Sequence, residues 1–416
     1  MKLVYANRNN EVFEEEQWGA LGRSGSDIID VLPEEWIPLP NGATLVSLPD
    51  TRPVGIDPIT GEMAMYPQDV YSVGALLPQG YTRLMIPSYV KTDTTRVLPL
   101  FGYTATAWHN GQFYVAAEKT DAPDPWNPQN VDVGVLNASV KEILTKYPEN
   151  RVYKHLSKCA LEYECLTASN TFLRRLEGAV SVSYSCNAAC FGCISEQPEE
   201  SGFPAPQTRM NFKPEIDEIV QIMREQLTAE NRIITFGQGC EGEPSTQAKI
   251  IIAAMKQIRS ETQNGYININ TNGGLTDYLR AIVDAGLNLM RVSTISAIDE
   301  HYNAYYKPRG YDLKNVEKTI RYATDKGVYT SINYLIFPGV MDRQEELEAM
   351  IEFARRSGLR RIQLRNLNVD AEAYMKIVPS PQGEIFGMKQ AIQILRDELP
   401  QVSIGNYTVV PPKGIA

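Results

Sequence analysis

The sequence has little histidine and an excess of acidic charge. Only three of its 416 residues are His, and 50 acidic against 40 basic side chains give a formal net charge of −10. A nucleic-acid-binding protein normally presents a basic face, so this balance disfavours a nucleic-acid partner. No run of about 18 apolar residues occurs, and we therefore expect neither a membrane span nor a membrane partner.

The chain also has few cysteines and no recognisable export signal. The amino-terminal segment lacks the apolar core of a signal peptide, which favours a cytoplasmic protein. Thiols stay reduced in the cytoplasm, so the six Cys are better suited to metal binding than to disulfides.

Three of the cysteines form one short motif. Cys186, Cys190 and Cys193 have the spacing C-x3-C-x2-C. Thiolates are the standard ligands of a 4Fe–4S cluster, and three of them leave one iron of the cubane without a protein ligand. An open position distinguishes a reactive metal site from a structural one. Zinc is the alternative, but it usually takes four ligands, and none of the His residues lies near the triplet in sequence.

Composition and periodicity divide the chain into four parts. Residues 1–150 are rich in Pro, Gly, Trp and Tyr, and Asn110-Gly111 separates two short apolar runs, which predicts a hairpin within a strand-rich accessory domain. We expect a helical connector at residues 151–177 and a carboxyl-terminal helix and tail at residues 376–416. Between them, residues 178–375 alternate between predicted strands and predicted helices.

This alternation predicts an α/β fold with a parallel sheet. The six predicted strand–helix units are too few for an eight-stranded barrel. In parallel α/β folds the reactive groups gather at the carboxyl ends of the strands. The first predicted strand, at residues 179–184, ends at the cysteine motif, where this rule places the chemistry.

The cysteine motif resembles the signature of the radical S-adenosylmethionine (SAM) superfamily. The resemblance implies a partial (β/α)6 barrel and a 4Fe–4S cluster held by the three Cys, with SAM on the open iron through its amino and carboxylate groups. It implies an oxidoreductase in which one electron cleaves SAM to methionine and a 5′-deoxyadenosyl radical. That radical would abstract hydrogen from a small-molecule or peptide substrate, and a protein such as flavodoxin or ferredoxin would donate the electron. Many members have an aromatic residue just before the third Cys, where this chain has Gly192 and places Phe191 one position earlier.

Further motifs follow the next two predicted strands. Gly242, Glu243 and Pro244 resemble the superfamily's Gly-Glu-Pro motif, whose groups bind the SAM amino nitrogen, and a carboxylate suits an ammonium group. Asn272 lies in a Thr-Asn-Gly segment that is common at this place in the superfamily. Without the resemblance, both segments are ordinary turns rich in Gly and Asn.

The later strands contribute three more candidates. By resemblance, Ser293 would contact the SAM ribose and Asn333 would help to hold SAM. Arg309 would pair with the SAM carboxylate, with Lys307 as the alternative; Arg suits a carboxylate better because its fork is bidentate. Each residue also has an ordinary interpretation, as a packed Ser, a hydrogen-bonded buried Asn or a solvated surface cation.

Three cysteines lie outside the triplet. Cys240 lies next to the Glu243 motif and is a candidate catalytic thiol, although a free Cys is more often a small buried hydrophobe. Alternatively, Cys159, Cys165 and Cys240 hold a second cluster, a question that the sequence leaves open.

No motif identifies the substrate, and three functional hypotheses remain. The first is a radical SAM enzyme whose accessory domain closes the open side of the barrel mouth and excludes water and oxygen. The second is a glycyl-radical enzyme activase, although such activases are often shorter and lack a large amino-terminal domain. The third is a non-catalytic iron–sulfur or metal-binding scaffold protein.

Overall fold

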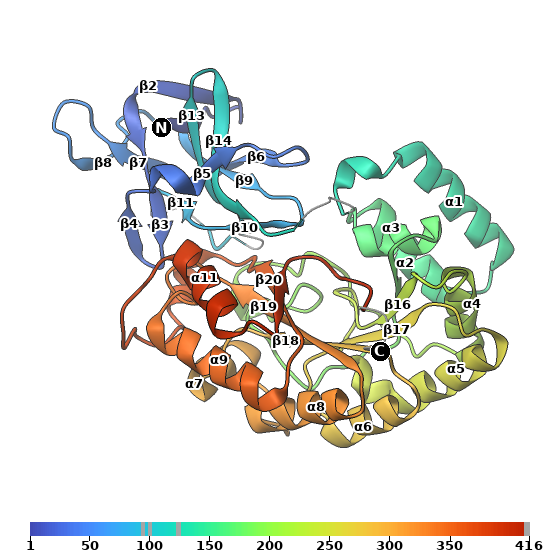
Figure 1. Cartoon of the computed structure of the whole chain (residues 1–416). Coiled ribbons are helices and arrows are strands. Elements are labelled where there is room, and N and C mark those ends of the chain that lie inside the picture. The colour runs from blue at the N-terminus through green and yellow to red at the C-terminus, as the bar shows by residue number, and fades with distance from the viewer. Residues whose placement is uncertain (93–95, 99–101, 122–125, 412–416) are drawn as a thin grey trace.

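The computed structural model describes residues 1–92, 96–98, 102–121 and 126–411. Its amino-terminal part consists of antiparallel strands (Figure 1). The strands are β1 (Lys2–Ala6), β2 (Val12–Ala20), β3 (Gly22–Ser24), β4 (Asp27–Ile29), β5 (Trp36–Pro38), β6 (Thr44–Leu48), β7 (Thr51–Ile56), β8 (Met63–Met65), β9 (Tyr71–Leu76), β10 (Tyr81–Arg83), β11 (Ile86–Pro87), β12 (Tyr89–Lys91), β13 (Thr104–His109) and β14 (Gln112–Lys119). An 11-stranded sheet follows the path β10-β14-β13-β9-β1-β2-β7-β12, with β5, β6 and β8 paired to its members, and β11-β3-β4 form a three-stranded sheet.

The hairpin predicted at Asn110-Gly111 is confirmed. β13 and β14 pair in antiparallel register, with His109 opposite Gln112. The two turn residues both have positive φ, 49° for Asn110 and 81° for Gly111. A two-residue type I′ turn requires this conformation, which Asn and Gly adopt at low cost.

Three helices connect the antiparallel part to the parallel sheet that follows it in the chain. They are α1 (Val133–Lys146), α2 (Arg151–Leu161) and α3 (Leu166–Leu173). The side chains of Asp132 and Asn150 cap the first two by accepting hydrogen bonds from the amides of Val135 and Tyr153. Their apolar faces belong to the same large core as the barrel strands, so these helices pack as part of the barrel.

The carboxyl-terminal part is a parallel sheet covered by helices. Its strands are β15 (Glu177–Val180), β16 (Ile233–Phe236), β17 (Tyr266–Thr271), β18 (Leu289–Thr294), β19 (Tyr329–Ile336), β20 (Arg361–Asn366) and β21 (Ser403–Gly405). Its α-helices are α4 (Ile216–Gln226), α5 (Ala248–Glu261), α6 (Thr276–Asp284), α7 (Asp299–Tyr306), α8 (Leu313–Asp325), α9 (Gln344–Ser357), α10 (Ala371–Met375) and α11 (Met388–Glu398). Short 3-10 helices are η1 (Pro33–Glu35), η2 (Pro128–Asn130), η3 (Glu199–Ser201) and η4 (Pro244–Gln247).

The parallel sheet is a partial barrel of strand–helix units. The seven strands are paired in chain order from β15 to β21, and every pairing is parallel. The first six strands are those expected from the alternating pattern. β21 is an additional strand that the sequence does not predict, because its three residues contain only one large apolar side chain, Ile404.

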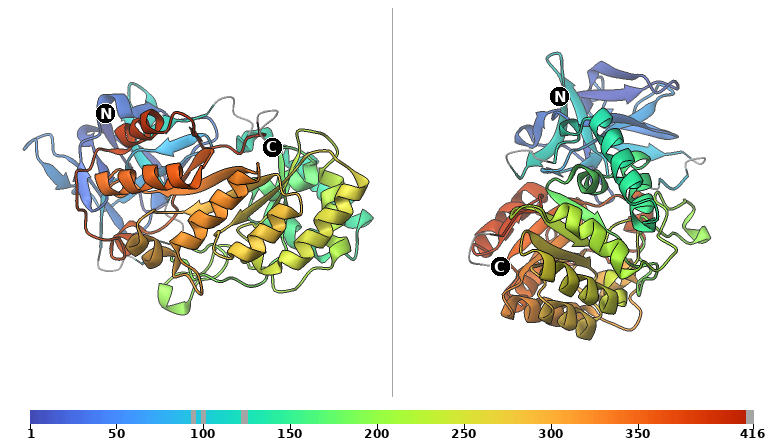
Figure 2. Two further views of the ribbon diagram at one scale, coloured as in Figure 1. Left: turned by 60° about the horizontal axis from the view of Figure 1, so that its bottom comes forward. Right: turned by 90° about the vertical axis from the view of Figure 1, so that its right-hand side faces the viewer.

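The helices cover the outer face of this sheet, as the yellow and orange ribbons of Figure 2 show. In α8, for example, the buried side chains include Leu313, Val316, Ile320 and Ala323. Intervals of three and four residues place them on one face of a helix, which packs on the sheet while the opposite face meets solvent. In the described part of the chain, no helix combines the length and the apolar character of a membrane span.

The antiparallel part packs against the last strands of the barrel. The guanidinium of Arg83 is fully buried between the two parts and donates a hydrogen bond of 2.8 Å to the carbonyl of Leu367. The amide of Gly25 donates to the carbonyl of Pro338 at 2.8 Å, and Lys91 forms an ion pair with the buried Asp370. Polar contacts at several points therefore fix the accessory part beside the carboxyl end of β20.

Candidate active site

The loop after β15 carries the cysteine motif and is held by backbone pairing. The amide of Ala189 donates to the carbonyl of Tyr306 at 3.1 Å, and the amide of Phe191 donates to the carbonyl of Tyr305 at 2.8 Å. Both acceptors lie at the end of α7. Segments about 115 residues apart in sequence thus determine the path of the loop, and the loop is not free to rearrange.

The three thiols of the motif line one cavity. Cys186, Cys190 and Cys193 are partly exposed and contribute to the wall of a cavity of about 400 Å³. Burial raises the pKa of Cys186 and of Cys190, because a desolvated thiolate is costly, and a metal that replaces the protons would supply the positive charge that stabilises the thiolates. Arg209 Nη2 donates to the sulfur of Cys193 at 3.4 Å, which stabilises negative charge there. This donor set fits a 4Fe–4S cluster held by three thiolates.

The structure explains why the residue before the third Cys is glycine. A β-carbon at Gly192 would lie 2.7 Å from the Tyr305 hydroxyl oxygen and 2.8 Å from Val369 Cγ1. Tyr305 also lines the cavity and is only 3% exposed. The aromatic side chain beside the motif therefore comes from α7, about 110 residues later in the chain.

The Glu243 carboxylate joins the loop after β16 to the end of β17. Its Oε1 accepts hydrogen bonds from Ser245 N at 3.0 Å, Ser245 Oγ at 2.5 Å and Thr271 Oγ1 at 2.5 Å. Its Oε2 accepts one, from Asn272 N at 2.8 Å. Burial raises the pKa of Glu243, while these donors favour the ionised form.

Gly242 allows the same loop to approach the cysteine loop closely. Its amide donates to the carbonyl of Ser183 at 2.7 Å, and the amide of Glu243 donates to the carbonyl of Ser185 at 2.8 Å. A β-carbon at position 242 would lie 2.0 Å from the Ser185 carbonyl oxygen. Only glycine fits between the two backbones.

Polar side chains from three further strands reach the cavity. Ser293 and Asn333 are directly opposite each other on β18 and β19, and both line the cavity with Asn272. Asn272 Nδ2 donates to Asn187 Oδ1 at 2.7 Å, while the buried Nδ2 of Asn187 has no hydrogen-bond partner. Through this bond Asn272 contacts the cysteine loop next to Cys186.

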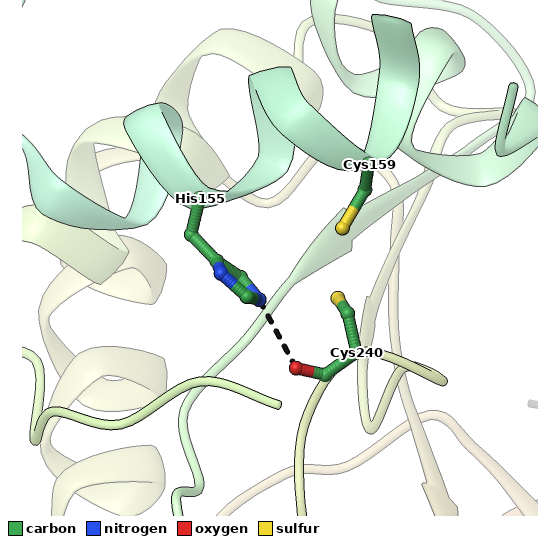
Figure 3. Close-up of side chains that lie close together, drawn as sticks. All are labelled: His155, Cys159 and Cys240. Atoms are coloured by element: carbon green, nitrogen blue, oxygen red, sulfur yellow. Dashed lines mark hydrogen bonds between the residues drawn. The ribbon is translucent and has the colours of Figure 1, made fainter. Parts of the chain in front are cut away.

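The cavity collects most of the residues that the sequence singled out as candidates. They are Cys186, Cys190, Cys193, Gly242, Glu243, Pro244, Asn272, Ser293 and Asn333. Arg309 and Lys307 are exposed, and neither lines the cavity. Among the described residues, no Lys or Arg lines it. Cys240 lies outside it, beside α2 (Figure 3).

Glu241 is a structural residue that the sequence analysis missed. Its Oε1 accepts from the amides of Gly237 and Gln238 at 2.9 and 2.8 Å, and its Oε2 from those of Val182 and Ser183 at 2.7 and 2.8 Å. Burial raises its pKa to about 7, against the effect of these four donors. The carboxylate thus joins the ends of β15 and β16. An acidic residue beside glycines, two positions before Glu243, is the one sequence signal for this role.

A second, smaller cavity adjoins the first. Its volume is about 210 Å³, and it lies between the loop after β9 and the end of β20. Asn366 and Asn368 line both cavities. Of the described residues in its wall, one is a cation, Arg365, and several carry amide side chains, such as Gln79.

Comparisons with known proteins agree with this site. Residues 180–354 match the family model described as the radical SAM superfamily. The chain therefore contains a domain that matches the radical SAM superfamily, whose members are enzymes that use a 4Fe–4S cluster and SAM. No curated protein matches the chain.

Several solved structures are similar to this chain. SuiB of Streptococcus suis bound to S-adenosylmethionine is 15% identical, with 68% of this chain and 69% of that chain covered and a TM-score of 0.39. The FeFe-hydrogenase maturase HydG of Carboxydothermus hydrogenoformans is 15% identical, with 67% and 71% covered and a TM-score of 0.38. A radical SAM methyltransferase of Sphaerobacter thermophilus is 18% identical, with 57% and 67% covered and a TM-score of 0.40.

Proposed function

We propose that the protein binds a 4Fe–4S cluster and SAM in the 400 Å³ cavity and starts a radical reaction on a small substrate held in the adjoining one. The observation that carries this proposal is the convergence of three thiols, a carboxylate and several polar side chains on one cavity at the carboxyl end of a parallel sheet. When bound, these cofactors supply the reductive cleavage of SAM to methionine and a 5′-deoxyadenosyl radical. A one-electron donor such as flavodoxin or ferredoxin is part of the proposal.

Cys186, Cys190 and Cys193 are the proposed cluster ligands. Two backbone hydrogen bonds to the end of α7 hold the loop that carries them. Arg209 is a cation in contact with one of them, and its hydrogen bond to Cys193 favours the thiolate over the thiol. The sulfurs therefore lie at the cavity wall with a charge partner behind them.

Glu243 is the proposed partner of the SAM amino group. A carboxylate has about four acceptor sites on its two oxygens. Among the described residues three donors reach Oε1, but only Asn272 N reaches Oε2. Oε2 therefore keeps an acceptor site for an ammonium group, and the donors on Oε1 hold the carboxylate in place.

Ser293 and Asn333 are the proposed contacts to the rest of SAM. Because they are opposite each other on neighbouring parallel strands, they present a hydroxyl and an amide at the same height of the barrel. The exposed Arg309 does not line the cavity, so we propose neutral donors rather than this cation for the SAM carboxylate.

Arg365 is the proposed anchor for the substrate. The oxygens that its guanidinium contacts are neutral: Gln79 Oε1 at 3.2 Å, Asn333 Oδ1 at 3.4 Å and Gln363 Oε1 at 3.5 Å. Burial lowers its pKa to about 10, so it remains cationic at neutral pH. Its side chain is partly exposed at the cavity wall, and in the described part of the chain no carboxylate forms an ion pair with it, which is costly for a largely buried cation. We infer that the substrate is a small molecule with a carboxylate or another anionic group.

The first experiment tests the cofactors. Anaerobically reconstituted protein should contain about four irons per chain and, after reduction with dithionite, convert SAM to 5′-deoxyadenosine. Cys186→Ala, Cys190→Ala and Cys193→Ala should each lose the iron and this product. A fully loaded wild type that leaves SAM intact would favour the scaffold hypothesis, and a chain that binds only zinc would refute the proposal.

The second experiment tests the SAM site by calorimetry. Glu243→Gln should retain iron and bind SAM at least tenfold more weakly, because it loses the charge-assisted contact, worth about 1.5–3 kcal/mol. Arg309→Ala is the matched control, since the side chain is exposed and outside the cavity. Equal SAM affinities of Glu243→Gln and the wild type would contradict the proposed role.

The third experiment tests the class of substrate. The melting temperature of the wild type is measured with small carboxylic acids and with the corresponding primary amides. The acids should raise it, and the amides should not. In Arg365→Gln the effect of the acids should vanish, because the guanidinium that attracts them is gone. Equal shifts with acids and amides would contradict an anionic substrate.

A further inference from the structure

A second group of metal-ligating side chains lies outside the cofactor cavity. His155, Cys159 and Cys240 each offer one ligand atom, and these atoms all lie within 4.8 Å of one another. Figure 3 shows the three side chains pointing into the same space between a helix and a loop. None of them contributes to the 400 Å³ cavity.

Two secondary elements bring these ligands together. His155 and Cys159 are four residues apart in α2, and this spacing places them on the same face of the helix. Cys240 comes from the loop between β16 and η4, more than 80 residues later. Pairs of ligands at i and i+4 of a helix are a recurrent way to present two donors to one metal.

The surroundings favour a metal that prefers sulfur. Cys159 and Cys240 are only 1% and 3% exposed. Both line a cavity of about 100 Å³ together with Cys165, whose backbone amide donates to the carbonyl of Cys159 at 3.0 Å. A tetrahedral set of three thiolates and one imidazole is a standard structural zinc site, whereas an iron–sulfur cluster ordinarily takes thiolates alone.

We propose that His155, Cys159 and Cys240 bind one Zn²⁺ ion, with Cys165 as the fourth ligand across the small cavity. His155 Nε2 lies 3.0 Å from the carbonyl oxygen of Cys240, and coordination through Nε2 replaces this hydrogen bond and leaves the ring proton on Nδ1. Each thiol gives up its proton when the metal binds, so zinc uptake releases protons to the solvent.

The position of the site indicates a structural role. Cys240 directly precedes Glu241, whose carboxylate joins the ends of β15 and β16. Its own carbonyl accepts a hydrogen bond of 2.8 Å from the amide of Met210. A metal bound here ties α2 to the loop that carries Glu243. It therefore supports the proposed SAM site from behind without facing it, and its presence does not depend on the iron site.

The test measures zinc and iron separately in the full-length protein. Purified wild type should contain one zinc per chain besides the iron, with zinc-edge X-ray absorption distances of about 2.3 Å to sulfur and about 2.0–2.1 Å to nitrogen. Cys240→Ser and His155→Ala should lose the zinc and keep the iron. His109→Ala is the control, because His109 is exposed on the β13–β14 hairpin and should leave the zinc content unchanged.

Several results would overturn the proposal. They are a wild type without zinc, a Cys240→Ser protein that retains it, a Cys159–Cys240 disulfide found by mass spectrometry of freshly isolated protein, and iron rather than zinc bound by these side chains. A Cys165→Ser protein that binds zinc as tightly as the wild type would overturn the assignment of the fourth ligand. Should Cys240→Ser fail to fold, the partly exposed His155 supplies the decisive variant.

Discussion

Replacing Gly242 by Ala should separate the two loops that form the cofactor cavity. The new β-carbon would lie 2.0 Å from the carbonyl oxygen, 2.5 Å from the carbonyl carbon and 3.0 Å from the amide nitrogen of Ser185. All three are backbone atoms, so no rotamer change can relieve the contact. One of the two loops has to move by roughly 1.4 Å or more to restore an ordinary contact distance.

The cost can be worked out from the contacts that such a shift disrupts. The hydrogen bonds from Gly242 N to Ser183 O and from Glu243 N to Ser185 O are 2.7 and 2.8 Å long. Each contributes about 0.5–1.5 kcal/mol net, and overpacking a closely fitted site adds about 1–3 kcal/mol. The sum is roughly 2–6 kcal/mol, and every 1.4 kcal/mol corresponds to about a tenfold change in an equilibrium constant.

Calorimetry with SAM and denaturant unfolding together measure this cost. We expect Gly242→Ala to lose at least tenfold in SAM affinity, to be less stable, or both, because the shift moves Glu243 relative to Cys186. Gly134→Ala is the control: it lies in α1, and its β-carbon would meet only Asp132 Oδ1, at 3.2 Å. In a helix, Ala is favoured over Gly by up to about 1 kcal/mol.

The reasoning fails if Gly242→Ala binds SAM with unchanged affinity and unfolds at the same denaturant concentration as the wild type. In that case the close approach of the two loops would be absent in solution. A loss of the same size in Gly134→Ala would show instead that the assay responds to any added methyl group.

Two further predictions concern the buried ion pair and the cysteine loop. Glu177→Gln should lower the free energy of unfolding by about 3–5 kcal/mol, because Arg291, 3.1 Å away, stays buried without its anion. Burial raises the pKa of Glu177, but Arg291 and the hydrogen-bond donors lower it by more, so that the net pKa lies below the ordinary 4.5. The stabilisation that the ionised Glu177 contributes is therefore present above pH 4.5 and is lost as the pH falls through the lowered pKa. Urea unfolding at several pH values checks this, and equal pH profiles of the variant and the wild type would contradict it. Gly192→Ala should lower the iron content of reconstituted protein, because its β-carbon would lie 2.7 Å from the Tyr305 hydroxyl. Adding Tyr305→Phe to this variant should partly restore the iron content. Unchanged iron in Gly192→Ala alone would show that the loop has room for the methyl group.

The sequence by itself determined the features that depend on neighbouring residues. Cys186, Cys190 and Cys193 are separated by so few residues that one loop must carry all three, whatever the rest of the chain does. Alternating strand and helix patterns predicted a parallel sheet because side-chain periodicity is a local property. The turn at Asn110-Gly111 was predictable for the same reason, since positive φ is a preference of single residues.

Only the tertiary structure decided which distant side chains meet. Ser293 and Asn333 reach one cavity because parallel strands end at the same edge of the sheet, whereas the exposed Arg309 lies outside it. Cys240 is three residues from Glu243 in sequence, yet it lies against α2 with His155, because the direction of a loop side chain depends on what packs around the loop. Ser293 and Asn333 are 40 residues apart in sequence and His155 and Cys240 are 85 apart, so no local pattern encodes these contacts.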